Sequence, residues 1–512
     1  MPQTDRRPRR TEKPEKEAPA PPKPESPFDK APVVSRSVVT VGGKQVRYAV
    51  HTGMMPLRDE QGEDEAGIFY MAYIREDAAK GAGRPLMFSF NGGPGSASLW
   101  LHLGALGPRR VETLEDTLPP PPYKVIDNEY TWLDETDLVF IDPVGTGFSK
   151  PRTAEVGKKF WGLEGDVRSI GEFIRLFLTR FQRWSSPLFI VGESYGTTRA
   201  AGLAGHLIDR GIALNGIVLV SSILNFQTAR FCRGNDLPYV LFLPTYTATA
   251  WYHGRLAPEL QADLEATLAE AEAFAAGPYS EALAKGDRLA ADERAELVRR
   301  VARYTGLSEE YIDETDLRVQ IHRFCKELLR REKRSVGRLD SRFKGIDALA
   351  ATEYPDHDPA MTVIMPPYTS AFNAYVRGEL KWETDDVYQV LGTGIKSPWD
   401  WGSAGNGYPD TSEALRSAFS KNPHMRVFVA SGYYDLATPY FATEYTLSHM
   451  GLDPEVRGNI STGEYRAGHM MYVHADSLAA LKADVSRFMQ EALRVAQGDG
   501  GGGDGVAMAR RL

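Results

Sequence analysis

The chain has 512 residues and a formal net charge of -8, with 42% apolar and 25% charged residues. These values are close to those of an average soluble globular protein, so they exclude a collagen-like, a fully disordered and a supercharged chain. A mildly acidic balance without a basic stripe also argues against nucleic acid as a partner.

In chain order, the first segment is rich in proline and charge, and we expect residues 1–34 to be a disordered tail. Its arginines are not followed by an apolar segment, so we predict no signal peptide and expect a cytoplasmic location, with export as the open alternative. Short apolar runs then predict buried strands at 86–90, 138–142, 188–191, 217–221 and 427–431. Such nearly continuous apolar strands are typical of a parallel sheet covered on both faces.

Amphipathic segments between these runs predict helices. Over 166–181 the apolar residues recur at helical spacing, with Asp166 as the expected N-cap. Alternating strands and helices predict the α/β class with a doubly wound, mostly parallel sheet. From 258 to 343 the chain is rich in alanine, glutamate, leucine and arginine and has no strand signal, so we expect helices only.

That helical block interrupts the alternation, so we interpret it as a cap inserted into the α/β core. No segment reaches the ~18 consecutive apolar residues of a membrane span. Cys232 and Cys325 are too few for a disulfide framework, and whether they pair stays open. The expected division is a core of 35–226 and 346–496, a cap of 227–345 and a flexible glycine-rich tail of 497–512.

The sharpest local motif surrounds Ser194. Gly192, Ser194 and Gly196 form a G-x-S-x-G pattern directly after a predicted strand and before a helical stretch. In that context the pattern predicts a nucleophile elbow, a sharp turn that exposes a serine at the top of a sheet. The alternative is an ordinary glycine-rich turn between a strand and a helix.

A nucleophilic serine needs a base, and the base needs an orienting acid. Asp435 follows the predicted strand 427–431, and His469 lies in a glycine-flanked loop before the last predicted helix. The order serine, acid, histidine is that of enzymes built around such an elbow. Taken singly, Asp435 could be a helix cap and His469 a surface residue. Together they predict a catalytic triad of Ser194, Asp435 and His469.

A second glycine-rich motif, NGGPG at 91–95, follows the predicted strand 86–90. Unhindered backbone N–H groups at the top of a sheet suit the stabilisation of a developing oxyanion. We expect the N–H groups of Gly93 and Tyr195 to form this oxyanion hole. The alternative is a structural Gly-Pro turn.

Together these motifs resemble the signature blocks of the serine carboxypeptidases, peptidase family S10, in a bacterial-type form. The resembling blocks are FNGGPGSASLWLHLGALGPRRV, DETDLVFIDPVGTGFSK, VGESYG, SGYYDLATP and AGHMMY. The resemblance extends over about residues 38–488. It implies an α/β-hydrolase fold with a helical insertion. It also implies release of single residues from the C-terminus of a peptide substrate.

The resemblance further implies that Asn91, Gly92 and Glu193 bind the terminal carboxylate of the substrate. Glu193 must be protonated for this, because two carboxylates so close together would repel. The chain departs from the family where a second glutamate is expected, because Ala105 stands there. Without that neighbour we expect Glu193 to hold its proton less firmly, and activity to depend less on acid pH.

Two alternatives remain open. The same triad serves an esterase or acyltransferase, which would not require a free carboxylate on the substrate. A catalytically silent scaffold that binds partners is the other. We expect no metal or cofactor, since HExxH, cysteine–histidine, P-loop and GxGxxG motifs are missing from the sequence. The sequence does not predict the oligomeric state.

Overall fold

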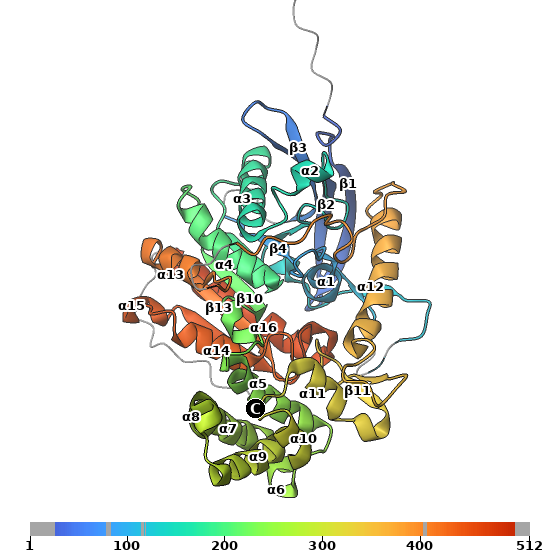
Figure 1. The fold of residues 1–512 in the computed structure, drawn as a ribbon. Coiled ribbons are helices and arrows are strands. Elements are labelled where there is room, and N and C mark those ends of the chain that lie inside the picture. The colour runs from blue at the N-terminus through green and yellow to red at the C-terminus, as the bar shows by residue number, and fades with distance from the viewer. Residues whose placement is uncertain (1–25, 78–82, 114–116, 118, 403–406, 497–512) are drawn as a thin grey trace, which may run out of the picture.

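The computed structural model describes residues 26–77, 83–113, 117, 119–402 and 407–496 (Figure 1). The predicted tail at 497–512 lies outside these ranges, as does most of the one at 1–34. The end of the latter belongs to the fold, because Phe28 is buried and β1 begins at Val33. The folded chain therefore starts earlier than predicted.

Among the described residues, ten strands form one central sheet, in the order β1-β2-β3-β7-β4-β9-β10-β13-β14 with β8 beside β3. From β7 to β14 all neighbouring strands are parallel, whereas β1, β2 and β3 pair antiparallel at one edge. The strands are β1 (Val33–Val41), β2 (Lys44–Arg58), β3 (Asp64–Arg75), β4 (Leu86–Phe90), β7 (Asp137–Ile141), β8 (Lys150–Pro151), β9 (Leu188–Ser194), β10 (Gly216–Ser222), β13 (Arg426–Gly432) and β14 (Ile460–Tyr465).

The five predicted strands correspond to β4, β7, β9, β10 and β13. The antiparallel strands β1 to β3 and the edge strand β14 were not predicted. In β14 the burial is only partial along most of its length. Its sequence therefore lacks the continuous apolar run from which the other strands were predicted.

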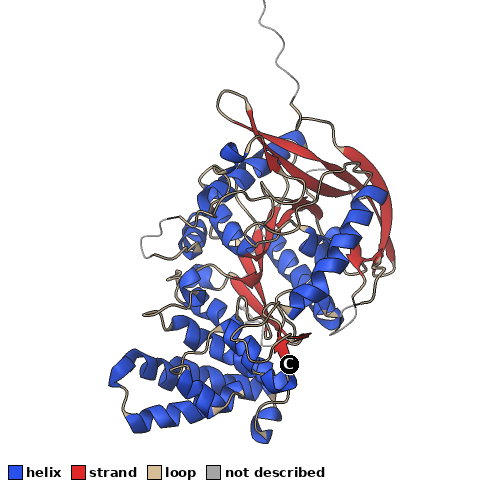
Figure 2. Ribbon diagram, turned by 45° about the vertical axis from the view of Figure 1, so that its right-hand side comes forward, coloured by secondary structure: helices blue, strands red, loops and turns tan. Residues whose placement is uncertain are grey.

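Helices cover both faces of the sheet, as Figure 2 shows. Along β9, Phe189 and Ile190 point to opposite faces and join separate hydrophobic clusters. One face is covered by α3 (Leu163–Arg180), α4 (Tyr195–Ile208), α13 (Ser412–Lys421) and α14 (Tyr440–Ser448), and the other by α12 (Pro359–Gly378) and α16 (Ala475–Ala496). This layered, mostly parallel arrangement is the α/β-hydrolase fold that the sequence predicted.

The predicted N-cap of α3 is wrong. The helix begins at Leu163 after Gly162, and Asp166 lies inside its first turn. Asp166 is buried there and its Oδ2 accepts a hydrogen bond of 2.8 Å from Arg199 Nε. The acidic residue at this position therefore serves the buried ion pair with Arg199. The pair joins two helices, so no local sequence pattern predicts it.

A group of helices, which we call the cap, lies at one end of the molecule (Figures 1 and 2). It consists of α5 (Leu237–Tyr252), α6 (Pro258–Gln261), α7 (Leu264–Phe274), α8 (Ser280–Lys285), α9 (Ala291–Thr305), α10 (Glu309–Glu314) and α11 (Ile321–Glu327). Its core includes Tyr246 stacked on Phe324 with ring centroids 4.1 Å apart. The prediction of helices only up to residue 343 is wrong, because β11 (Arg334–Val336) pairs with β12 (Lys344–Ile346).

The remaining elements are short: α1 (Leu99–Leu101), α2 (Ala154–Gly157), α15 (Pro454–Arg457), β5 (Arg109–Val111) and β6 (Val125–Asp127). None of the helices in the described ranges is long and apolar enough to cross a membrane.

Candidate active site

Ser194 occupies the turn between β9 and α4. Its φ is +60° and its ψ is -129°, a strained conformation for a residue with a side chain. A Cβ at Gly192 would lie 2.2 Å from the carbonyl oxygen of Gly196, and one at Gly196 would lie 2.9 Å from that of Phe90. Both glycines are therefore required for close backbone packing. The geometry is that of a nucleophile elbow.

Asp435 and His469 meet at the same edge of the sheet, beyond the carboxyl ends of β13 and β14. His469 Nδ1 lies 2.7 Å from Asp435 Oδ2, and both side chains are buried. Asp435 Oδ1 also accepts hydrogen bonds from the backbone N–H of Ala437 at 2.8 Å and of Thr438 at 3.1 Å. The hydroxyl of Thr438 donates to Asp435 Oδ2 at 2.6 Å. These donors fix the carboxylate that orients the histidine.

Burial alone would lower the pKa of His469, but attraction to Asp435 outweighs it, so the net pKa is raised. Because Nδ1 faces Asp435, Nε2 is the ring nitrogen left for the serine. In the described part of the chain, no hydrogen bond joins Ser194 Oγ to His469. Such contacts often tighten only when substrate binds. The structure thus joins two predicted triad members directly and places Ser194 at the same edge.

The NGGPG loop packs directly on the elbow. A Cβ at Gly92 would lie 2.4 Å from the backbone nitrogen of Tyr195, so only glycine allows this approach. Gly93 has a φ of +104°, which also favours glycine. The backbone N–H groups predicted for the oxyanion hole, those of Gly93 and Tyr195, therefore come from two adjoining segments.

A buried ion pair supports this loop from behind. Arg199 Nη1 donates to the carbonyl oxygen of Asn91 at 2.7 Å, while its Nε binds Asp166. Both side chains are almost completely buried. Sequence reasoning missed this pair, although a charged residue in the otherwise apolar and small-residue helix α4 is a signal that could have pointed to it.

Asn91 and Glu193, the residues predicted to bind a carboxylate, are in contact. Asn91 Nδ2 donates to Glu193 Oε1 at 3.0 Å, and Tyr472 OH donates to Glu193 Oε2 at 2.5 Å. Asn91 Oδ1 accepts from the backbone of Leu101 at 3.1 Å, which fixes the orientation of the amide. Glu193 is buried with only 3% of its surface exposed. Sequence reasoning did not identify Tyr472 as a member of this group.

Burial raises the pKa of Glu193 to about 7, although His469 and the two hydrogen-bond donors act in the opposite direction. This corrects the basis of the prediction made from Ala105. That prediction took repulsion by a carboxylate at position 105 as the cause of a raised pKa, whereas here burial is the largest cause and the charge of Asp435 adds to it.

A segment after α12 covers the NGGPG loop and also escaped prediction. The backbone of Ala97 donates to Val390 O at 3.0 Å, and that of Gly392 donates to Gly95 O at 2.8 Å. Further along, Trp399 and Trp401 pack edge-on against the ring of Tyr195 at centroid distances of 5.5 and 5.9 Å. This segment thus packs against the residue that follows the nucleophile.

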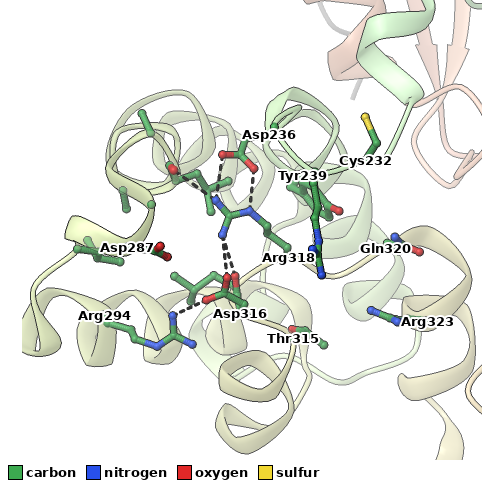
Figure 3. A pocket seen from close by; sticks show the side chains of 18 residues that line it. Cys232, Asp236, Tyr239, Asp287, Arg294, Thr315, Asp316, Arg318, Gln320 and Arg323 are labelled. Carbon is green, nitrogen blue, oxygen red and sulfur yellow. Dashed lines mark hydrogen bonds and ion pairs between the residues drawn. The ribbon is translucent and has the colours of Figure 1, made fainter.

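A large cavity of about 970 Å³ lies in the cap, and none of the predicted site residues lines it. Figure 3 shows Arg318 between Asp236 and Asp316, with Arg294 pointing to Asp316. The ion-pair distances are 2.7 Å for Arg318–Asp236 and 2.6 Å for Arg294–Asp316. These charges are therefore paired with one another. Within the described ranges, no cluster of three or more histidine, cysteine, aspartate or glutamate residues could hold a metal ion.

Comparison with known proteins gives several matches. One curated relative, serine carboxypeptidase-like 5 of Arabidopsis thaliana, is 31% identical over 153 residues, which are 28% of this chain and 33% of that protein. The pheromone-processing carboxypeptidase KEX1 of Saccharomyces cerevisiae is 32% identical over 157 residues, which are 28% of this chain and 20% of that protein. The matched stretch thus covers a third or less of these relatives.

A solved structure described as KEX1(delta)p, a prohormone-processing carboxypeptidase from Saccharomyces cerevisiae, aligns with 87% of this chain and 92% of its own. The TM-score is 0.55 at 17% sequence identity, so this likeness concerns the fold. The family model described as serine carboxypeptidase matches residues 42–461, which include Ser194 and Asp435 and end shortly before His469. Because this match covers most of the sequence, the chain belongs to the serine carboxypeptidase family.

Proposed function

We propose that the protein is a serine carboxypeptidase, which releases C-terminal residues from peptides through an acyl-enzyme on Ser194. The observation that carries this proposal is the buried, hydrogen-bonded pair of Asn91 and Glu193 beside the nucleophile. An ordinary esterase has no need of a buried acid there. Membership of the family and the Asp435–His469 contact give further support.

In the proposed mechanism, Ser194 Oγ attacks the scissile carbonyl while His469 Nε2 accepts its proton. Asp435 holds the imidazole in the required tautomer and stabilises the imidazolium. The N–H groups of Gly93 and Tyr195 bind the oxyanion, and each is worth about 3–4 kcal/mol in the transition state. His469 then protonates the leaving amine, and water resolves the acyl-enzyme by the same route.

The terminal carboxylate of the peptide would be bound by Asn91 Nδ2, the N–H of Gly92 and protonated Glu193. A pKa of about 7 keeps Glu193 largely protonated in mildly acidic solution. Above that pH an ionised Glu193 would repel the substrate carboxylate. Activity on peptides should therefore fall as the pH rises above about 7, and also fall as the pH drops below neutral, because the raised pKa of His469 leaves the imidazole protonated there.

The test is release of free amino acid from a blocked dipeptide and from its C-terminal amide, across the acid and neutral pH range. We expect cleavage of the acid form alone, with the decline described above, and no cleavage by Ser194→Ala. Equal cleavage of acid and amide, or cleavage of esters only, would instead identify a general acyl hydrolase. A serine-directed fluorophosphonate that failed to label Ser194 would point to a silent scaffold.

A further inference from the structure

The carboxyl group of Glu193 is held from two sides. Asn91 donates to Oε1 from the NGGPG loop, and Tyr472 donates to Oε2. Tyr472 lies in the short 3-10 turn Met471–Val473, close behind His469 in the chain. Its hydroxyl therefore links the loop of the catalytic histidine to the acid of the carboxylate site.

The backbone makes room for this tyrosine. A Cβ at Gly104 would lie 2.3 Å from Tyr472 Cε2 and 2.8 Å from Tyr368 OH, so the two tyrosines fill the space above that glycine. The next residue, Ala105, is buried and brings no second acidic group to the site. The group that contacts Glu193 Oε2 is thus a phenol.

We propose that Tyr472 is a positioning residue of the carboxylate site, which orients Glu193 for the terminal carboxylate of a peptide. This inference rests on the proposed function. A phenol differs from a carboxyl partner because it donates a hydrogen bond and brings no negative charge of its own. Burial keeps the pKa of Tyr472 well above its ordinary value, so it stays a donor in neutral solution.

Several groups face Glu193, and they act in opposite directions. Burial and the charge of Asp435 raise the pKa of Glu193, while His469 and the donors Tyr472 and Asn91 lower it. Tyr368 also interacts with Glu193, and burial raises the pKa of Tyr368. Removing the hydroxyl of Tyr472 therefore raises the pKa of Glu193 further. The carboxylate site would then keep its proton, and bind substrate, to a higher pH.

The experiment compares Ser194→Ala with Ser194→Ala/Tyr472→Phe, by calorimetric binding of a blocked dipeptide from acid to alkaline pH. Phenylalanine keeps the ring against Gly104. We expect binding about three- to tenfold weaker in mild acid, because a bond that orients the acid is lost. The alkaline limit of binding should move upward by about one pH unit. In the active enzyme, Tyr472→Phe should raise KM more than it lowers kcat.

Tyr304→Phe is the matched control. Tyr304 OH donates to Glu270 Oε1 at 2.7 Å in the cap, so this variant loses the same kind of bond far from the site and should keep the alkaline limit unchanged.

Equal weakening at every pH by Tyr472→Phe, without movement of the alkaline limit, would overturn the positioning role. Binding of the dipeptide by Ser194→Ala with no turnover by the wild type would instead overturn the proposed function alone. Absence of binding to Ser194→Ala at any pH would overturn both.

Discussion

Carboxyl groups at the edge of the sheet and in the cap lie in opposite environments. At the sheet edge, Asp435 and Glu193 are buried, and within the described residues neither forms an ion pair with a lysine or arginine. In the cap, Asp236 and Asp316 are partly exposed, and Arg318 binds both. The sheet edge thus holds acids by hydrogen bonds in a dry setting, and the cap holds them by countercharges near water.

This difference distinguishes carboxyl groups that can take part in a reaction from those that stabilise the fold. Burial without a countercharge raises the pKa of a carboxyl group, as it does to about 7 for both Glu193 and Asp142. Such displaced proton affinities are typical of sites that bind or move protons. Charges that are paired with one another are instead neutralised, so they exert little electrostatic effect on a substrate.

The largest effect is expected at Asp435. Asp435→Asn keeps the size of the side chain but presents an amide to His469 Nδ1, which favours the wrong tautomer. We expect kcat to fall about 10⁴-fold with KM little changed. Steady-state kinetics on a blocked dipeptide measures this. Asp236→Asn in the cap is the control, and its kcat should equal that of the wild type. A loss below tenfold for Asp435→Asn would contradict the assignment of the triad.

The second effect is on stability at Glu193. Because its pKa rises from 4.5 to about 7 on folding, the folded state holds a proton that the unfolded state has released. This group therefore lowers the free energy of unfolding as the pH rises through that window, by about 3 kcal/mol in all. Glu193→Gln removes the titration. Its stability relative to the wild type should increase between pH 4.5 and pH 8 in urea denaturation.

Glu270 in the cap offers the control of opposite sign. A hydrogen bond from Tyr304 lowers the pKa of Glu270, so this residue adds stability as the pH rises. Glu270→Gln should therefore lose stability relative to the wild type as the pH rises through the range below 4.5, and show no trend between pH 4.5 and pH 8. Equal pH trends in the two variants would remove the distinction between the sheet edge and the cap.

Much of the fold and of the site followed from local patterns. The five buried strands are short apolar runs with turn residues at their ends, and the elbow and the NGGPG loop need glycine for steric reasons visible in the sequence. Asp435 and His469 were predicted because chain order and strand context restrict the choice. These features are local, so the sequence carries them directly.

The rest depends on contacts between distant segments. Arg199 and Asp166 pair across two helices, and Tyr472 reaches Glu193 only because its loop and the elbow share one edge of the sheet. The raised pKa of Glu193 comes from burial, which no motif states. Likewise β14 is half-buried and lacks an apolar run. Tertiary packing, rather than pattern, determines each of these.

The smallest effect is expected in the cap, at Asp316. Asp316 has a φ of +53°, a conformation that asparagine tolerates better than most residues, so Asp316→Asn tests charge without adding strain. The substitution removes ion pairs with Arg294 at 2.6 Å and with Arg318 at 3.3 Å. Because the Asp316 side chain is 68% exposed, the loss of stability should stay below about 1 kcal/mol and shrink further in high salt.

Urea denaturation at two salt concentrations measures this loss of stability, with kcat/KM as a second readout that should not change. A marked fall in kcat/KM would mean that the cap cavity takes part in catalysis, and the division between a chemical edge and a structural cap would have to be abandoned.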